Sequence, residues 1–223
     1  MNTQAYGGPE IHEQARITAD GRQLDGELII PEEATGVVLF AHGSGSSRHS
    51  PRNQFVAETL REAGLGTLLF DLLTREEEAV DRETGHLRFD IELLARRLAA
   101  ATEWFGSQAF SDLGVGYFGS STGGGAALVA AAELGDRVGA VVSRGGRPDL
   151  AGFALPRVKS STLLIVGGDD TQVIELNKRA FEMLPCEKEL KIIPGASHLF
   201  EEPGTLEQVA ELAAQWFKRH LQR

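Results

Sequence analysis

This chain of 223 residues and 24.0 kDa is long enough for one α/β domain with a substantial core, which we take to span residues 1–223. Hydrophobic residues make up 42% of it and charged residues 24%, a balance typical of globular proteins. The formal net charge of -10 argues against a nucleic-acid partner, because such a partner would bind a basic face.

The sequence shows neither a membrane span nor a secretory signal. No apolar run approaches the roughly 20 residues that cross a bilayer. The opening stretch, MNTQAYGGPEIHEQ, has no basic start and no apolar segment. The single cysteine, Cys186, cannot form an internal disulfide. We therefore expect a cytoplasmic protein without a membrane partner.

Strands are expected to alternate with helices along the chain. An opening hairpin turns at Asp20-Gly21, and short apolar runs that are typical of strands buried on both faces follow it. These runs are GVVLFAHG, LGTLLFDLL, VGYFG, VGAVVS, STLLIVGG and ELKIIPG. The alternation predicts a mostly parallel eight-stranded sheet with helices on both faces.

Helix signals fall between these runs. Ser50 is a typical N-cap, Pro51 fits a first turn and Gly64 fits a helix end. Apolar residues at helical spacing from Leu87 to Phe105 predict a long amphipathic helix. The charged run before it, TREEEAVDRETGH, is expected to be a solvated loop able to border a pocket. A last helix is expected to start near Thr205.

A glycine-rich junction, VGYFGSSTGGGAALVAAAEL, links one strand to an alanine-rich helix. Gly114, Gly116 and Gly119 spell the G-x-G-x-x-G of dinucleotide sites, but two of these glycines fall inside the strand rather than in the turn after it. A phosphate loop would need Gly-Lys-Ser/Thr, which is absent from the sequence. Neither nucleotide reading therefore fits the context.

The same junction contains Gly-Ser-Ser-Thr-Gly, which is the G-x-S-x-G pattern of a nucleophile elbow. This turn lifts Ser121 above the sheet, and the crowding of strand and helix requires very small residues at Gly119 and Gly123. It also presents the backbone N–H of Thr122 at a helix N-terminus, where an oxyanion is favoured. A glycine-rich turn without chemistry is the alternative.

A serine nucleophile needs a base, and the base needs a carboxylate to hold it. Asp169 and Asp170 follow one strand of the predicted sheet, and His198 follows the last. In parallel sheets, side chains at the carboxyl ends of strands share one edge. The order serine, acid, histidine is the one expected with this elbow.

With these residues the chain resembles the α/β-hydrolase superfamily, in particular its small, lidless branch related to dienelactone hydrolases. The resemblance runs from VVLFAHGSG through GYFGSSTGGGAAL and LLIVGGDDTQV to IIPGASHLF. It implies that Asp170, in Gly-x-x-Asp-x-x-Val, is the acid; Asp169 is the alternative acid, or else caps the next helix. It also implies an oxyanion donor in the backbone N–H of Ser44. His42 is expected to be structural, because the triad already has its base. The short interval from Arg144 to Ser161 contains Pro148 and Pro156, so no cap domain is expected there. Dienelactone hydrolases proper carry cysteine at the elbow, so their substrate is not implied.

Taken together, the sequence predicts a serine hydrolase that cleaves short-chain carboxylic esters through an acyl-enzyme, without a metal or cofactor. A thioesterase, lactonase or peptidase would use the same residues, and a non-catalytic binding protein is the alternative from another class. The expected partner is a small-molecule ester, and the expected assembly is a monomer or homodimer. Arg144 and Arg147 lie where they would bind an anionic group on the substrate, or else make surface ion pairs.

Overall fold

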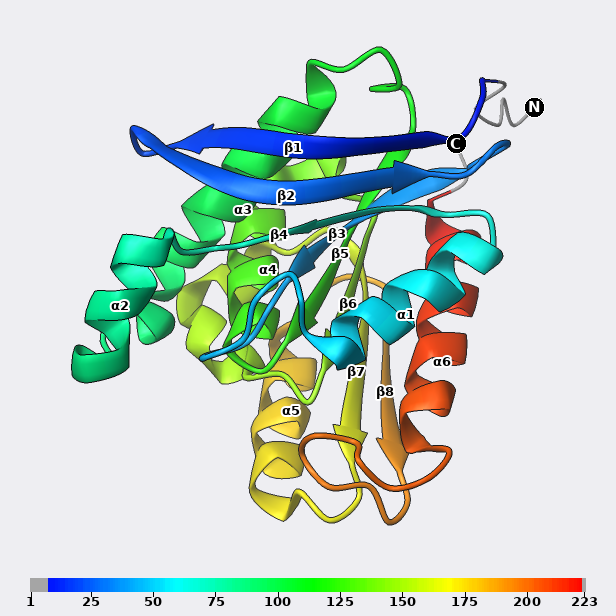
Figure 1. The fold of residues 1–223 in the computed structure, drawn as a ribbon. Helices are drawn as coiled ribbons and strands as arrows, with labels where there is room; N and C mark the ends of the chain where they lie inside the picture. The colour runs from blue at the N-terminus through cyan, green and yellow to red at the C-terminus, as the bar shows by residue number, and fades with distance from the viewer. Residues whose placement is uncertain (1–7, 222–223) are drawn as a thin grey trace.

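The computed structural model describes residues 8–221, and one eight-stranded sheet runs through them (Figure 1). The strand order is β1-β2-β4-β3-β5-β6-β7-β8, which confirms the expected sheet. The strands are β1 Ile11–Ala19, β2 Arg22–Ile30, β3 Gly36–Ala41, β4 Gly66–Phe70, β5 Gly114–Ser120, β6 Ala140–Arg144, β7 Ser161–Gly167 and β8 Lys188–Ile193.

The sheet is parallel except at one edge. β2 pairs antiparallel with both β1 and β4, so the opening hairpin extends the sheet on that side. From β4 across to β8 all neighbouring strands are parallel. The carboxyl ends of these strands therefore meet at a common edge, where open α/β sheets place their ligands.

Helices cover both faces of the sheet (Figure 1). α1 and α6 pack on one face, and α3, α4 and α5 pack on the other. The helices are α1 Pro51–Glu62, α2 Arg75–Thr84, α3 Ile91–Gly106, α4 Thr122–Leu134, α5 Thr171–Met183 and α6 Thr205–His220, with short 3₁₀ segments η1 Leu87–Phe89, η2 Gly135–Arg137 and η3 Pro148–Arg157. α1 begins as predicted, because the Ser50 side chain accepts a hydrogen bond from the N–H of Asn53.

The central strands are apolar on both sides because each side contributes to a separate core. In β3, Val37 and Leu39 face the α3–α4 side, whereas Val38 and Phe40 face α1 and α6. In the neighbouring β5, Phe118 packs against Phe40 with the rings tilted and their centroids 5.0 Å apart. A strand buried on both faces loses the polar–apolar alternation of a surface strand, which is why these segments read as continuous apolar runs.

One expectation about the chain between β4 and α3 is wrong. The run TREEEAVDRETGH is not a loop but contains α2. A reciprocal capping box between Thr74 and Glu77 starts this helix, and Gly85, in the left-handed conformation, ends it. The amphipathic helix also begins later than Leu87. α3 starts at Ile91, and Asp90 is its N-cap, whose side chain accepts a hydrogen bond from the backbone N–H of Leu93.

The interval between β6 and β7 is too short and too bent to form a cap. It holds only η3, which is kinked at Gly152 (φ 47°) and contains Pro156. The absence of a cap domain from this interval was expected. In the described part of the chain no helix combines the length and apolarity that a membrane span requires.

Candidate functional site

Ser121 occupies a strained turn between β5 and α4. Its φ of 51° and ψ of -121° lie in a region that residues other than glycine rarely adopt. Three backbone hydrogen bonds hold it there: its N–H donates to the carbonyl of Arg144 (3.3 Å), and its carbonyl accepts from the N–H groups of Gly124 and Arg147 (both 3.0 Å). Hydrogen bonds to β6 and to the residues that follow it thus help to maintain the strained conformation of Ser121.

The two glycines of the elbow allow a close approach of backbone to backbone. A Cβ atom on Gly119 would lie 2.5 Å from the carbonyl oxygen of Gly123. A Cβ atom on Gly123 would lie 2.0 Å from the carbonyl oxygen of Ala41, at the end of β3. Neither contact is possible for a real side chain, so the crossing of β5, α4 and β3 requires glycine at both positions.

Asp170 and His198 form a hydrogen-bonded pair at the same edge of the sheet. Oδ2 of Asp170 lies 2.6 Å from Nδ1 of His198, and their side chains are 15% and 39% exposed. Asp170 stands at the N-cap position of α5 but makes no capping hydrogen bond with its side chain, so its carboxylate is available to the imidazole. This leaves the Nε2 side of the ring as the one directed away from the carboxylate.

Asp169 lies in a different environment. Its backbone N–H donates to the carbonyl of Ala196 (3.0 Å), but its side chain is exposed and has no partner among residues 8–221. Of the two adjacent aspartates, the structure therefore brings Asp170 to the histidine.

Gly145, the residue after β6, connects the histidine loop to the elbow. A Cβ atom on Gly145 would lie 3.1 Å from the carbonyl oxygen and 3.6 Å from Cε1 of His198. Gly145 directly follows Arg144, whose carbonyl accepts from Ser121. Within the described residues no hydrogen bond joins the Ser121 hydroxyl to the imidazole; such contacts are often loose before substrate binds.

The two predicted oxyanion donors lie side by side. The hydroxyl oxygens of Ser44 and Thr122 are 3.1 Å apart, although the residues are far apart in sequence. No carbonyl or side chain in residues 8–221 accepts from the backbone N–H of either residue. Gly43, before Ser44, packs on the elbow: its Cβ would lie 3.1 Å from that of Ser121. Two unused donors thus flank the serine.

His42 holds the loop after β3 in place. Its Nδ1 lies 3.0 Å from the carbonyl oxygen of Gly43, to which it donates, and its Nε2 accepts from the N–H of Leu72 (2.9 Å). Burial lowers the pKa of His42, which favours the neutral ring that this pattern requires. With both nitrogens engaged, His42 links the ends of β3 and β4 and is not free to act as a base.

The two arginines expected near the substrate are engaged elsewhere. Arg144 is buried, with Nη2 3.4 Å from Oδ1 of Asn53 and its guanidinium carbon 5.9 Å from the centre of the Phe200 ring. Burial lowers its pKa to about 10, so the side chain stays charged at neutral pH. Arg147 makes a forked pair with Asp149 at 2.8 and 2.7 Å. Substrate binding by Arg144 and Arg147 stays a prediction.

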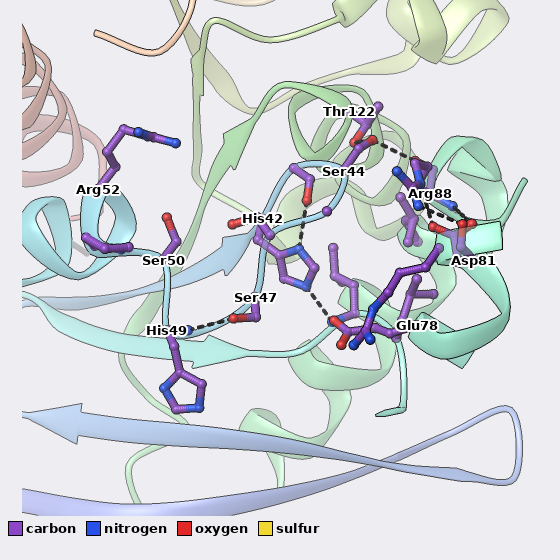
Figure 2. A pocket seen from close by; sticks show the side chains of 18 residues that line it. His42, Ser44, Ser47, His49, Ser50, Arg52, Glu78, Asp81, Arg88 and Thr122 are labelled. Carbon is purple, nitrogen blue, oxygen red and sulfur yellow. Dashed lines mark hydrogen bonds and ion pairs between the residues drawn. The ribbon is translucent and has the colours of Figure 1, made fainter. Parts of the chain in front are cut away.

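A cavity of about 640 Å³ opens beside Thr122 (Figure 2). Its hydroxyl and apolar lining comprises Ser44, Ser46, Ser47, Ser50, Pro51, Leu72, Leu73 and Leu94. Its charged or titratable lining comprises His42, His49, Arg52, Glu78, Asp81, Arg82 and Arg88. Ser121, Asp170 and His198 do not line it, so the cavity adjoins the elbow on the side of the predicted oxyanion donors.

The charged run TREEEAVDRETGH does border this cavity, as was expected of it, but as a helix rather than a loop. Glu78, Asp81 and Arg82 come from the helix mistaken for a loop, and Arg88 follows in η1. Burial, together with the charge of Asp71, raises the pKa of Glu78. The capping box at Thr74 was the signal that could have revealed this helix. Among residues 8–221 no three His, Cys, Asp or Glu side chains gather closely enough to hold a metal ion.

We expect Gly123→Ala to lower the Tm sharply or to prevent folding, because the added Cβ would overlap the carbonyl of Ala41. Alanine normally stabilises a helix by about 1 kcal/mol relative to glycine. A fall in Tm would therefore show that the added Cβ has no room at this position. Gly106→Ala in α3 is the matched control: its Cβ would meet only Arg137, at 3.8 Å, and the Tm should hold or rise. Thermal unfolding followed by circular dichroism decides, and equal stability of the two variants would contradict the argument.

Comparison with known proteins places this geometry in a family. The model of the dienelactone hydrolase family matches residues 24–222. A crystal structure of a dienelactone hydrolase from Anabaena variabilis is 60% identical, with a TM-score of 0.93 over 96% of this chain and 100% of that one. Est1E from Butyrivibrio proteoclasticus is only 18% identical but shares the fold, with a TM-score of 0.77 over 92% and 98% of the two chains.

Proteins from two strains of Mycobacterium tuberculosis are 58% identical over 214 residues and carry the provisional name phosphoribosyl transferase. The match covers 96% of this chain but 47% of theirs, so the chain spans about half the length of these curated relatives. The family model, by contrast, accounts for most of the present chain, in agreement with its lidless α/β-hydrolase fold. The chain belongs to the dienelactone hydrolase family.

Proposed function

We propose that this protein is a serine hydrolase that cleaves short-chain carboxylic esters through an acyl-enzyme. Ser121 is the nucleophile, His198 the base and Asp170 the acid that orients it. The backbone N–H groups of Ser44 and Thr122 stabilise the oxyanion. The observation that carries the proposal is the 2.6 Å contact between Asp170 and His198 at the sheet edge where Ser121 stands in a strained turn.

In this mechanism, Ser121 Oγ attacks the ester carbonyl while Nε2 of His198 takes the hydroxyl proton. Negative charge then develops on the former carbonyl oxygen, where the two free N–H groups receive it. The imidazolium returns the proton to the departing alcohol, and water repeats the sequence on the acyl-enzyme. Asp170 fixes the ring with its proton on Nδ1 and stabilises the charged ring.

The same residues would support other acyl transfers. A thioester, a lactone or a peptide amide presents the same carbonyl to Ser121, so a thioesterase, lactonase or peptidase is the alternative within the class. A non-catalytic binding protein is the alternative outside it. A hydrolysis screen over these substrate types distinguishes the first group, and labelling with a fluorophosphonate probe distinguishes enzyme from binding protein.

The name of the mycobacterial relatives does not change the proposal. It describes proteins about twice as long as this chain, which matches about half of their length and itself belongs to the dienelactone hydrolase family. We further propose a monomer or homodimer in the cytoplasm, a setting that suits the unpaired, half-buried Cys186.

Ser121→Ala is expected to abolish ester turnover while preserving the fold, because the methyl group fits the turn. Loss of the nucleophile should lower kcat by several orders of magnitude, leaving the contribution of the oxyanion donors alone. Ser120→Ala, one residue earlier and buried at the end of β5, is the matched control and should cost far less. Steady-state kinetics on p-nitrophenyl acetate provides the measurement. The reverse order of effects would move the nucleophile to Ser120.

Asp170→Asn should lower kcat by about 10⁴-fold, because an amide in contact with Nδ1 supports the wrong tautomer of the imidazole. Asp169→Asn changes the same chemical group in an exposed side chain without a described partner, and should leave kcat nearly unchanged. Equal losses in the two variants would contradict the assignment of the acid.

The cavity beside Thr122 suits a small substrate. Serines and charged side chains make up much of its lining, and its hydrophobic side chains are Leu72, Leu73, Leu94 and Pro51. A long acyl chain gains binding energy at about 25 cal/mol for each Å² of apolar area buried. With a lining that is only partly apolar and no cap over it, the cavity would leave much of a long acyl chain exposed to water.

We therefore expect specificity to peak at short acyl groups, from acetyl to butyryl, with no increase in activity at a lipid–water interface. Values of kcat/KM for p-nitrophenyl esters from acetate to palmitate test this, with emulsified triglyceride as a second substrate. A maximum at the longest chains, or activation by the emulsion, would refute the preference.

A further inference from the structure

The wall of the cavity formed by α2 and η1 is held in an unusual way. Asp81 is the only buried residue of α2, and η1 buries none. A surface helix normally packs through an apolar stripe, and this one has none facing the molecule. The half-buried Leu87 of η1 packs against the core, but α2 buries no apolar side chain, so polar contacts must hold most of this wall.

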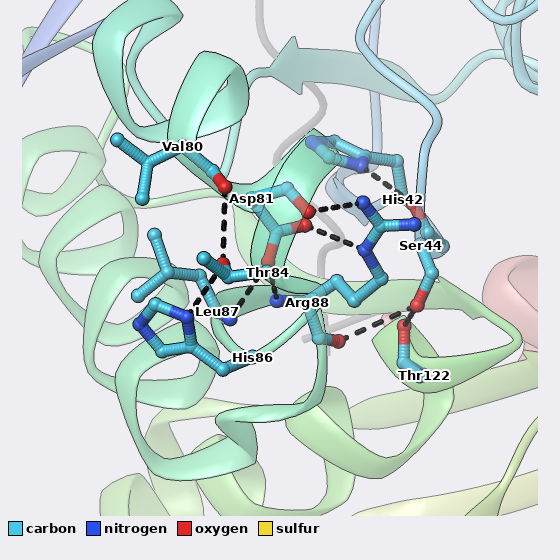
Figure 3. A network of polar contacts seen from close by, with 10 residues as sticks. His42, Ser44, Val80, Asp81, Thr84, His86, Leu87, Arg88 and Thr122 are labelled. Atoms are coloured by element: carbon cyan, nitrogen blue, oxygen red, sulfur yellow. Dashed lines mark hydrogen bonds and ion pairs between the residues drawn. The ribbon is translucent and has the colours of Figure 1, made fainter.

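Asp81 is the centre of those contacts (Figure 3). Its Oδ1 accepts from the backbone N–H groups of Leu87 (2.7 Å) and Arg88 (3.1 Å). Its Oδ2 accepts from Nε of Arg88 and its carbonyl accepts from Nη2 of the same side chain, both at 2.6 Å. The Asp81 side chain is 4% exposed. One buried carboxylate thus fixes both the backbone and the side chain of Arg88.

The backbone of Arg88 in turn reaches the oxyanion donors. The hydroxyl of Ser44 donates to the carbonyl of Arg88 (3.4 Å), and its oxygen lies 3.1 Å from that of Thr122 (Figure 3). Since Ser44 has a single hydroxyl proton, donation to Arg88 leaves Thr122 as the donor to Ser44. The hydroxyls form a chain from the first residue of α4 to the cavity wall.

We propose that Asp81 is a positioning residue for the oxyanion hole, acting through Arg88 and the Ser44 hydroxyl on the backbone N–H groups of Ser44 and Thr122. This inference rests on the proposed hydrolase function. Burial of Asp81 disfavours its charge, but the donors from Arg88 and Leu87 outweigh this and hold the pKa of Asp81 below its ordinary value. The carboxylate is therefore ionised at neutral pH and accepts all of these bonds.

Asp81→Asn tests the proposal because the Nδ2 of the asparagine cannot accept the hydrogen bond that Nε of Arg88 donates to the carboxylate. We expect kcat on p-nitrophenyl acetate to fall by up to about a hundredfold, as when a reacting group is slightly misplaced, with KM little changed. Rates are normalised to active sites titrated with a fluorophosphonate probe, so misfolded protein does not count. Glu103→Gln, which removes a carboxylate from an exposed pair with Arg137, is the control and should keep full kcat.

A double-mutant cycle with Ser44→Ala identifies the route. Ser44→Ala keeps the backbone N–H and the Asp81 contacts but removes the hydroxyl link, so kcat should fall while the Tm holds. If Asp81 acts through Ser44, the double variant should lose no more than the worse single variant. If the fold losses in kcat of the two single variants multiply in the double variant, the proposal is overturned. A kcat within twofold of wild type in either single variant would also overturn it. Should Asp81→Asn fail to fold, Ser44→Ala still tests the last link of the route, and a kcat within twofold of wild type in that variant would overturn the proposal.

Hydrogen exchange gives a readout that does not depend on ester chemistry. In Asp81→Asn, positioning predicts faster amide exchange in residues 43–47 as well as in 81–89, whereas a purely local role predicts it in 81–89 alone. Wild-type protein that neither hydrolyses esters nor reacts with the fluorophosphonate would refute the proposed function. The exchange pattern would still decide whether Asp81 orders the Ser44 loop.

Discussion

The close crossing of β5 and α4 at Ser121 is the constraint on which the rest of the site depends. Because Gly123 presses on the carbonyl of Ala41, the crossing also fixes the end of β3 and the loop that carries Ser44. On the other side, the backbone bonds of Ser121 to Arg144 and Arg147 fix the chain after β6, against which the histidine loop rests. A single junction thus fixes the chain on both sides of Ser121, the proposed nucleophile.

The parts of the structure that sequence reasoning found are those encoded locally. Apolar runs marked the strands, and small residues around Ser121 marked the elbow, because each pattern lies within a few consecutive residues, even where the contact it serves is distant in sequence, as for Gly123 and Ala41. The rule that parallel strands end at one edge then brought Asp170 and His198 together across 28 positions of sequence separation. Choosing between Asp169 and Asp170 required the resemblance, since the two differ only in which way each side chain points.

α2 was missed because it has no apolar periodicity. Its first turn carries Glu76, Glu77 and Glu78, and such a charged run reads as loop when hydrophobic spacing is the criterion. The start and stop signals were nevertheless present at Thr74 and Gly85. A helix of this kind forms from its caps and from tertiary bonds to charged groups, and those bonds lie beyond the reach of any local pattern. The hydrogen-bond partner of Arg144 could not be predicted for the same reason, because Asn53 lies in a helix distant in sequence.

The two parts of the site are held by different interactions. The predicted catalytic groups stand on strand ends and on glycine contacts that tolerate no added atom, so this part of the site is rigid and little open to change. The cavity wall is held instead by charged contacts, at Asp81 and by the pair between Glu77 and the buried Arg97. Removing one partner of such a pair is costly, but its exposed neighbours are free to vary. Exposed side chains of α2 such as Arg82 can therefore change which substrate fits the cavity without disturbing the elbow.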